Sequence, residues 1–206
     1  MTDLPFSQAA FDLCIAAEGC STTPDWPGGA SGVTIGYGYD LGYNTEDDLR
    51  LEWGDLPSAV LDRLAAMIGL IGSNAHAMIY SFRDVIIPQA MCIRVFEETS
   101  WPKAGRQMLT VFDAMALPLD CFGALQDLVY NRGTSLIGDR RREMAQIAKA
   151  LPTHPEVVPD LIRSMTRLWV GQNLDGLITR RNDEAALFKA ALAVLEDAAC
   201  VGTGPA

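Results

Sequence analysis

The sequence has few of the residues that bind metal ions. Only two histidines, His76 and His154, occur in 206 residues, and no Cys-x-x-Cys pair is present. Zinc and iron–sulfur sites need several such ligands close together. The spacing therefore predicts no metal site and no cofactor. It also predicts reduced thiols, buried as small apolar groups, at the five cysteines: Cys14, Cys20, Cys92, Cys121 and Cys200.

Positive charge and long apolar runs are scarce as well. The chain has 16 Lys and Arg against 26 Asp and Glu, a formal net charge of -10. A nucleic-acid-binding protein would normally carry a basic face, so that class is disfavoured. No uncharged stretch reaches the ~18 residues of a transmembrane helix, and Met1–Pro5 lacks the basic and apolar regions of a signal peptide. We therefore expect synthesis in the cytoplasm, no nucleic-acid partner and no stable membrane insertion.

The composition and the order of the predicted elements indicate one mostly helical α+β domain. The chain is 49% hydrophobic and 20% charged, as is typical of globular proteins. A helix is expected over residues 6–18, with Ser7 as its N-cap and Gly19 at its end. Residues 20–44 are rich in Gly, Pro, Ser, Thr and Tyr, and Val33–Tyr39 is expected to form a short strand with glycine turns around it, as part of a short β-hairpin.

From Thr45 onward the pattern is helical. Thr45 and Asp48 form a capping box at the start of one helix, and Pro57 suits the first turn of the next. Breaks are expected at Gly72, Pro102, Pro118, Gly133, Pro152 and Pro155. Further helices are expected over residues 73–84, 88–100, 103–113, 119–132, 139–151, 156–172 and 183–199.

Glu18 is a candidate general acid. It falls in the last turn of the first predicted helix, where the macrodipole is negative and a carboxyl group holds its proton more tightly. Burial in a cleft would act in the same direction. The alternative is a solvated glutamate at a helix end.

Thr34 and Asp40 are candidates for the other half of an acid/base pair. Their even spacing places both on the same face of a hairpin. Asp40 could deprotonate a water held by Thr34. Alternatively, Asp40 stabilises the turn through backbone hydrogen bonds, and Thr34 is an ordinary strand residue. Asp25, the nearest carboxylate before Thr34, is the other candidate base, although its neighbouring prolines predict a loop at the rim of the cleft.

Three segments occur in the order found in phage-type lysozymes (glycoside hydrolase family 24 and relatives). They are Glu18-Gly19 with the turn Thr34–Gly38, the segment 124–133 that ends in Asn131-Arg132-Gly133, and the segment 176–184 with Arg180-Arg181 and Glu184. The chain resembles that family from about residue 11 to 190. The resemblance implies a lysozyme-like fold for the single domain 1–206. It has a small β-containing lobe at about 20–55, a helical lobe at about 56–200, and a cleft between them.

The spacing departs from the common family pattern. Common members place a catalytic Asp or Cys nine residues after the Glu and six before the Thr, whereas Pro27 and Gly28 stand there in this chain. Residues 21–31 resemble an insertion in the hairpin. An Asp six residues after the Thr resembles the lysozyme domain of pesticin, a bacteriocin that degrades peptidoglycan. On that resemblance the base role falls to Asp40 in preference to Asp25.

The resemblance implies a muramidase. Such an enzyme hydrolyses the β-1,4 bond between N-acetylmuramic acid and N-acetylglucosamine with inversion, so Glu18 would protonate the leaving oxygen and Asp40 would activate a water held by Thr34. Aromatic faces stack on sugars, Asn131 could bind an N-acetyl group and Arg132 an anionic group. The alternative is core packing for the aromatic residues, a helix end for Asn131 and a solvated helix face for Arg132. The expected substrate contacts are therefore Trp26, Tyr37, Tyr39, Asn131 and Arg132.

Other functions stay open at this point. A lytic transglycosylase needs one acid only, and a chitosanase-like enzyme would fit the acidic charge. A glycan-binding module without turnover is a third possibility. The expected partners are peptidoglycan glycan strands and an immunity protein or inhibitor. The expected site of action is the periplasm or cell wall, reached by holin release as a phage endolysin or by secretion-system delivery as an effector.

Overall fold

The computed structural model describes residues 4–201, with side chains up to residue 195. Helices dominate, and the sheet in this part of the chain has three antiparallel strands. The prediction of a mostly helical α+β fold is therefore confirmed. Among the described helices none is long and apolar enough to cross a membrane.

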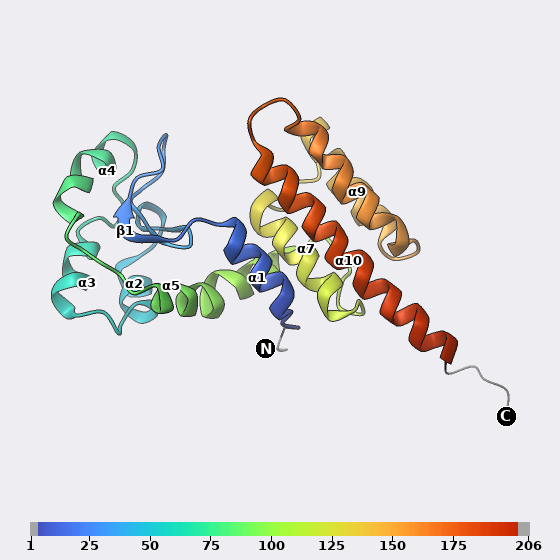
Figure 1. Ribbon diagram of the computed structural model, residues 1–206. Helices are drawn as coiled ribbons and strands as arrows, with labels where there is room; N and C mark the ends of the chain where they lie inside the picture. The colour runs from blue at the N-terminus through green and yellow to red at the C-terminus, as the bar shows by residue number, and fades with distance from the viewer. Residues whose placement is uncertain (1–3, 202–206) are drawn as a thin grey trace. The chain divides into compact units, whose positions relative to one another are not determined.

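The chain divides into two compact units, the sheet unit and the helical unit (Figure 1). The sheet unit is Glu18–Ser100, and the helical unit is formed by the chain before and after it. The smaller lobe was expected to end at about residue 55, but the sheet unit extends further. The reason is that α5 (Gln89–Val95) packs against strand β2 (Thr34–Gly36), and Ile87 donates its backbone N–H to Thr22 of β1 (Ser21–Asp25) at 2.7 Å.

The sheet has the strand order β1-β2-β3, where β3 is Tyr39–Asp40. Gly36 and Gly38 have φ values of 56° and 75°, a left-handed conformation that suits glycine and permits the tight turn between β2 and β3. The remaining elements of the sheet unit are η1 (Leu41–Tyr43), α2 (Glu46–Glu52), α3 (Ser58–Ala65), α4 (Gly72–Met78), η2 (Ile79–Phe82) and the π-helical η3 (Phe96–Ser100).

Helix α7 (Leu119–Arg132) forms the centre of the helical unit. Every residue from 121 to 129 is buried, because α1, α6 and α10 all pack against it. A helix that is covered on all sides needs small or apolar residues around its whole circumference. The other elements of this unit are α1 (Gln8–Ala17), α6 (Trp101–Met108), η4 (Asp139–Arg141), α8 (Arg142–Ala150), η5 (Pro155–Val157), α9 (Val158–Ser164), η6 (Met165–Leu168) and α10 (Asp175–Val201).

Most of the predicted helix signals are confirmed. The Ala10 backbone N–H donates to Ser7 Oγ at 3.0 Å, and the Asp48 N–H donates to Thr45 Oγ1 at 3.1 Å. Gly133 ends α7 with a φ of 70°. The break expected at Pro102 is wrong. Pro102 lies in the first turn of α6, where the missing backbone N–H of proline is tolerated. The π-helical turn η3 directly precedes α6.

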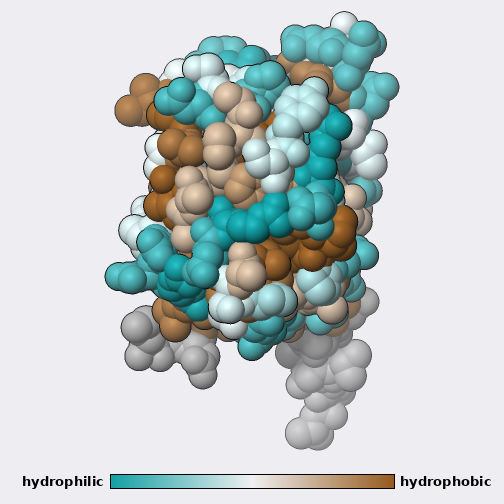
Figure 2. Space-filling model, turned by 90° about the vertical axis from the view of Figure 1, so that its left-hand side faces the viewer, coloured by the Kyte–Doolittle hydropathy of each residue, from teal (hydrophilic) through white to brown (hydrophobic). Residues whose placement is uncertain are grey.

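Apolar side chains interrupt the polar surface of the sheet unit. Figure 2, which views the molecule from the left-hand side of Figure 1, shows brown residues among the teal ones. Large hydrophobic residues exposed in this unit include Leu51, Tyr43, Tyr80 and Ile86. They come from separate elements, and hydrophobic residues scattered singly on a surface need no partner.

Candidate active site

Thr34 and Asp40 face each other across neighbouring strands. In the β2–β3 pair Thr34 is opposite Asp40, and Ile35 is opposite Tyr39. Directly opposed residues of an antiparallel pair project from the same face of the sheet. Ile35 and Tyr39 are buried, whereas Thr34 and Asp40 are half-buried. The predicted same-face arrangement of Thr34 and Asp40 is therefore confirmed, and we call their side of the sheet the open face.

Asp25 belongs to the same cross-strand row. It is the last residue of β1 and pairs with Thr34. Thr34 therefore has a carboxylate on each neighbouring strand, with opposed Cβ atoms typically about 4.5–5.5 Å apart. The loop predicted at Asp25 is a strand end instead, and its side chain is exposed. Both candidate bases thus flank Thr34.

The Asp40 carboxylate also has a structural role. Its Oδ2 accepts the Gly32 N–H at 3.1 Å, and its Oδ1 accepts the Gly42 N–H at 2.8 Å, which caps η1. The predicted alternative, that Asp40 stabilises the turn, is therefore confirmed. Each carboxylate oxygen has two acceptor positions, so each oxygen can accept one further hydrogen bond from water or substrate.

Glu18 is the first residue of the sheet unit. It directly follows Ala17, the last residue of α1, so its predicted position at the end of the first helix is confirmed to within one residue. Its side chain is half-buried. Gly19 and Cys20 then lead into β1, so Glu18 belongs to the same compact unit as the row on the open face.

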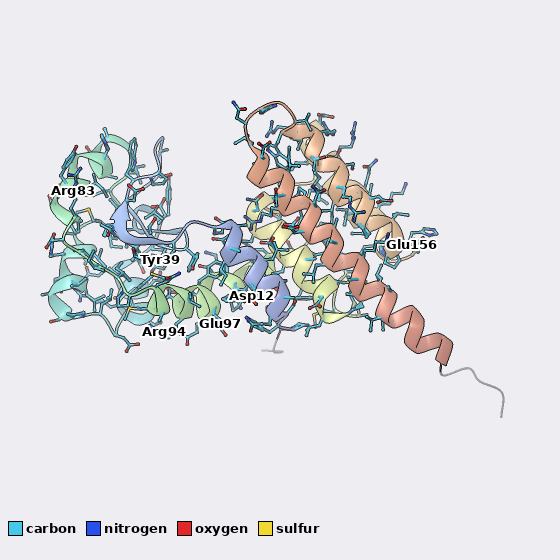
Figure 3. All side chains as sticks on the ribbon, in the orientation of Figure 1. Asp12, Tyr39, Arg83, Arg94, Glu97 and Glu156 are labelled. Atoms are coloured by element: carbon cyan, nitrogen blue, oxygen red, sulfur yellow. The ribbon has the colours of Figure 1, made fainter. Side chains whose placement is uncertain are left out.

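A groove of about 460 Å³ runs along β1. It is lined by residues 20–25, by Ile79 and by Arg83, which is labelled in Figure 3. The Arg83 guanidinium lies 4.0 Å from the Tyr80 ring centroid. The volume lies within the range of small-molecule sites. Asp25 lines this groove, and Asp40 is not among its described lining residues. Asp25 is therefore the candidate base that contacts this groove.

Tyr37 and Tyr39, predicted to stack on sugar rings, are core residues of the sheet unit instead. Each is only 6% exposed. The Tyr37 ring lies 5.5 Å from Phe96, and the Tyr39 ring meets Trp53 edge-on at 5.5 Å. Burial raises the pKa of both phenols. Because the tight turn brings Tyr39 opposite buried Ile35, the two side chains project from the same buried face of the sheet.

Trp26 and Tyr43 remain available at the surface near the hairpin. Trp26 is half-buried, its indole N–H donates to Ser31 O at 3.0 Å, and its ring centroid lies 4.6 Å from that of His76. Tyr43 is 67% exposed, with its hydroxyl donating to Ala30 O at 2.9 Å. The contact between Trp26 and substrate stays a prediction.

Asn131 and Arg132 lie at the end of α7 in the helical unit. Asn131 is half-buried and helical, so the left-handed residue at this helix end is Gly133. Arg132 is 8% exposed, donates Nη2 to Arg140 O and lies 5.1 Å from the Trp169 ring centroid. Burial and the neighbouring arginines lower its pKa to about 10. Arg132 is therefore a core residue rather than an exposed contact for an anionic group.

A buried ionic network in the helical unit was only partly predicted. Arg180 binds both oxygens of Asp127, and Arg181 binds Glu184 three residues later. All four side chains are nearly or fully buried. Arg181 and Glu184 are three residues apart, a spacing at which opposite charges on a helix pair, so this pair could be predicted from the sequence. Asp127 was missed, although a carboxylate within the mostly apolar segment 124–129 is a signal for a buried partner.

The described cysteines carry free thiols. Cys14, Cys92 and Cys121 are buried and Cys20 is half-buried, while the Cys200 side chain lies outside the described ones. Burial raises the pKa of Cys92 and of Cys121 to about 12, so both thiols stay protonated at neutral pH and are poor nucleophiles. Among the described residues, no group of three or more His, Cys, Asp or Glu side chains could hold a metal ion.

No profile of a protein family matches the chain, and no characterised protein is significantly similar to it in sequence.

Proposed function

We propose that the chain is a peptidoglycan hydrolase, a muramidase that cleaves the β-1,4 bond between N-acetylmuramic acid and N-acetylglucosamine with inversion. Glu18 is the general acid, Asp40 the general base, and Thr34 holds the attacking water. The observation that carries the proposal is the row Asp25–Thr34–Asp40 on the open face of the sheet, in the unit that Glu18 begins.

The chemistry needs these residue types together. An inverting glycosidase uses one carboxylic acid to protonate the leaving oxygen and one carboxylate to activate water, about 6.5–9.5 Å apart. A threonine hydroxyl both donates and accepts hydrogen bonds, so it can orient a water while a neighbouring carboxylate takes the proton. Asp40 retains one acceptor position on each oxygen for that purpose.

The resemblance of three segments to phage-type lysozymes supports the same proposal, including a lysozyme-like fold with a substrate cleft. On this proposal the enzyme acts in the periplasm or cell wall, after holin release or secretion-system delivery. An immunity protein or inhibitor is then the expected protein partner of an injected form.

Digestion of purified peptidoglycan, followed by mass analysis of the fragments, tests the proposal. Glu18→Gln should lower the rate of muropeptide release by at least about 100-fold, because general acid catalysis contributes roughly that much or more. Glu97→Gln, at an exposed residue of η3 in the same unit (Figure 3), is the matched control and should keep full activity. Undiminished wall lysis by Glu18→Gln would rule out the assignment.

One observation favours a second candidate, a lytic transglycosylase. Both Asp40 carboxylate oxygens accept hydrogen bonds from backbone N–H groups. This structural role explains an aspartate at position 40 even if it does not serve as a base. A transglycosylase needs Glu18 alone and releases 1,6-anhydro sugars. Fragments that end in anhydro-muramic acid, with activity retained in Asp40→Ala, would favour it over hydrolysis.

A further inference from the structure

A cavity of about 640 Å³ in the helical unit lies between the end of α1 and the start of α10. Its apolar lining includes Leu13, Ala17, Leu174 and Leu177. The volume is in the middle of the range for small-molecule sites, which are typically apolar with a few polar groups at fixed positions. The volume and lining therefore suit an aliphatic group.

The polar groups of this cavity give it a negative potential. Asp175 and Asp183 line it and are exposed, and neither has a hydrogen bond or ion pair with another described side chain. Arg180 also lines the cavity, but its guanidinium binds both oxygens of buried Asp127, which balances its charge. The N-terminus of α10 adds only about half a positive charge. Two uncompensated carboxylates outweigh it.

An apolar floor beside two free carboxylates is complementary to an aliphatic chain that ends in a cation. The peptide stem of peptidoglycan carries such a group, the ammonium-bearing side chain of its diamino acid at the third position. We propose that this cavity binds that side chain. The inference rests on the proposed function, since it assigns a further part of the same polymer to this protein.

Two kinds of variant alter the cavity without touching the proposed catalytic residues. Asp175→Asn/Asp183→Asn removes the negative charge. Gly176→Leu fills the space, because Gly176 lines the cavity and a Cβ atom added there meets nothing within 4 Å. The control Asp12→Asn/Asp113→Asn changes the net charge equally, at exposed residues of the same unit that do not line the cavity.

Kinetics on two polymers provide the first measurement. On glycan strands that carry their stems, both cavity variants should raise KM roughly tenfold at unchanged kcat, because they remove binding that is equal in ground and transition states. On strands stripped of stems by an amidase, KM should equal that of the wild type. An unchanged KM on stem-bearing strands, or an equal rise on both polymers, overturns the inference.

Direct binding separates failure of this inference from failure of the proposed function. The probe is the tripeptide L-Ala–γ-D-Glu–L-Lys, measured by calorimetry against wild type and both cavity variants, with its Nε-acetyl derivative as the uncharged control. Binding should be weakened at least about tenfold by acetylation or by either variant. If the wild type cleaves neither polymer yet binds the tripeptide in this way, the proposed function fails and the site stands. If it cleaves both polymers but does not discriminate between the two peptides, the site fails alone.

Discussion

Asp40 has a structural role beside the catalytic role that we propose for it. It ties Gly32 and Gly42 to the hairpin through two backbone hydrogen bonds. The approach is close enough that a Cβ atom added at Gly32 would lie 2.3 Å from Oδ1. Loss of activity in an Asp40 variant is therefore ambiguous unless folding stability is measured beside it.

The two aspartates beside Thr34 can be separated by such paired measurements. Asp40→Asn should lower the free energy of unfolding by about 1 kcal/mol, since the amide nitrogen cannot accept one of the two N–H groups. If Asp40 is the base, the rate should fall at least about 100-fold at temperatures where the variant remains folded. Asp25→Asn should leave both quantities nearly unchanged, because the carboxylate is exposed.

Urea titration and the rate of muropeptide release measure these two effects. A large rate loss in Asp25→Asn with full activity in Asp40→Asn would transfer the base role to Asp25, which lines the groove along β1.

At the scale of elements, the contact between α1 and α7 depends on one glycine. A Cβ atom added at Gly123 would lie 2.5 Å from Ala10 Cβ and 2.6 Å from Ser7 Cβ, so the two helices would have to move apart. Gly123→Ala should therefore lower the free energy of unfolding by about 1–3 kcal/mol. Gly176→Ala, where the added atom meets nothing within 4 Å, is the control and should be neutral or stabilising by up to ~1 kcal/mol. Equal stabilities of the two variants in urea would contradict the packing.

Glu143 of α8 connects elements that are distant in sequence. It is 1% exposed and accepts hydrogen bonds from Arg167 at 2.6 Å and from Arg142 at 3.1 Å. Burial alone would raise the pKa of Glu143, but these hydrogen bonds, with one from the backbone, hold it below its ordinary value. The unfolded chain therefore takes up this proton first as the pH falls. The stabilisation is complete above about pH 4.5 and is lost as the pH drops through the lower folded-state pKa.

Glu143→Gln should remove that part of the acid sensitivity. At pH 7 the variant should be less stable by about 1.5–3 kcal/mol, the usual contribution of hydrogen bonds to a charged group, and this difference should shrink as the pH falls below 4. Urea titrations of both proteins between pH 3 and pH 7 measure the effect. A constant stability difference across that range would mean that the carboxylate has the same pKa in folded and unfolded chains.

The elements that the sequence predicted well are those with local signals. Helix α7 has the expected bounds, 119–132, since Pro118 and Gly133 mark both ends. Strand β1 was predicted to be part of an insertion in the hairpin, because the spacing departs from the family pattern. Its Pro24 is tolerated because β1 is at the edge of the sheet. Helix α10 begins at Asp175 instead of 183. Its first turns are stabilised by the buried pairs of Arg180 and Arg181, and such long-range contacts have no local signature.

In the candidate site, too, the features with local signals were predicted and those that depend on long-range contacts were not. Even spacing was enough to place Thr34 and Asp40 on one face, since strand periodicity is local. Tyr37, Tyr39 and Arg132 are buried against aromatic rings that are distant in the sequence. The respective partners are Phe96, Trp53 and Trp169, between 14 and 59 residues away. Residue type alone suggested aromatic and cationic contacts for substrate; tertiary packing reassigned them to the cores of the two units.

At the scale of the whole molecule, the net charge of -10 bears on how the proposed enzyme approaches its polymer. Bacterial walls are largely anionic, so long-range electrostatics should oppose association at low ionic strength. Raising the salt concentration from about 10 mM to about 150 mM shortens the Debye length from roughly 30 Å to roughly 8 Å. The rate of lysis of intact walls should therefore rise over this interval.

A less anionic substrate separates this effect from any action of salt on the catalytic residues. On peptidoglycan stripped of its anionic polymers, the same change in salt should alter the rate less, because the repulsion scales with the charge on both partners. Wall lysis that slows as salt increases would mean that a local positive surface governs encounter despite the acidic total. The net negative charge would then come from the rest of the protein surface and would not affect association with the polymer.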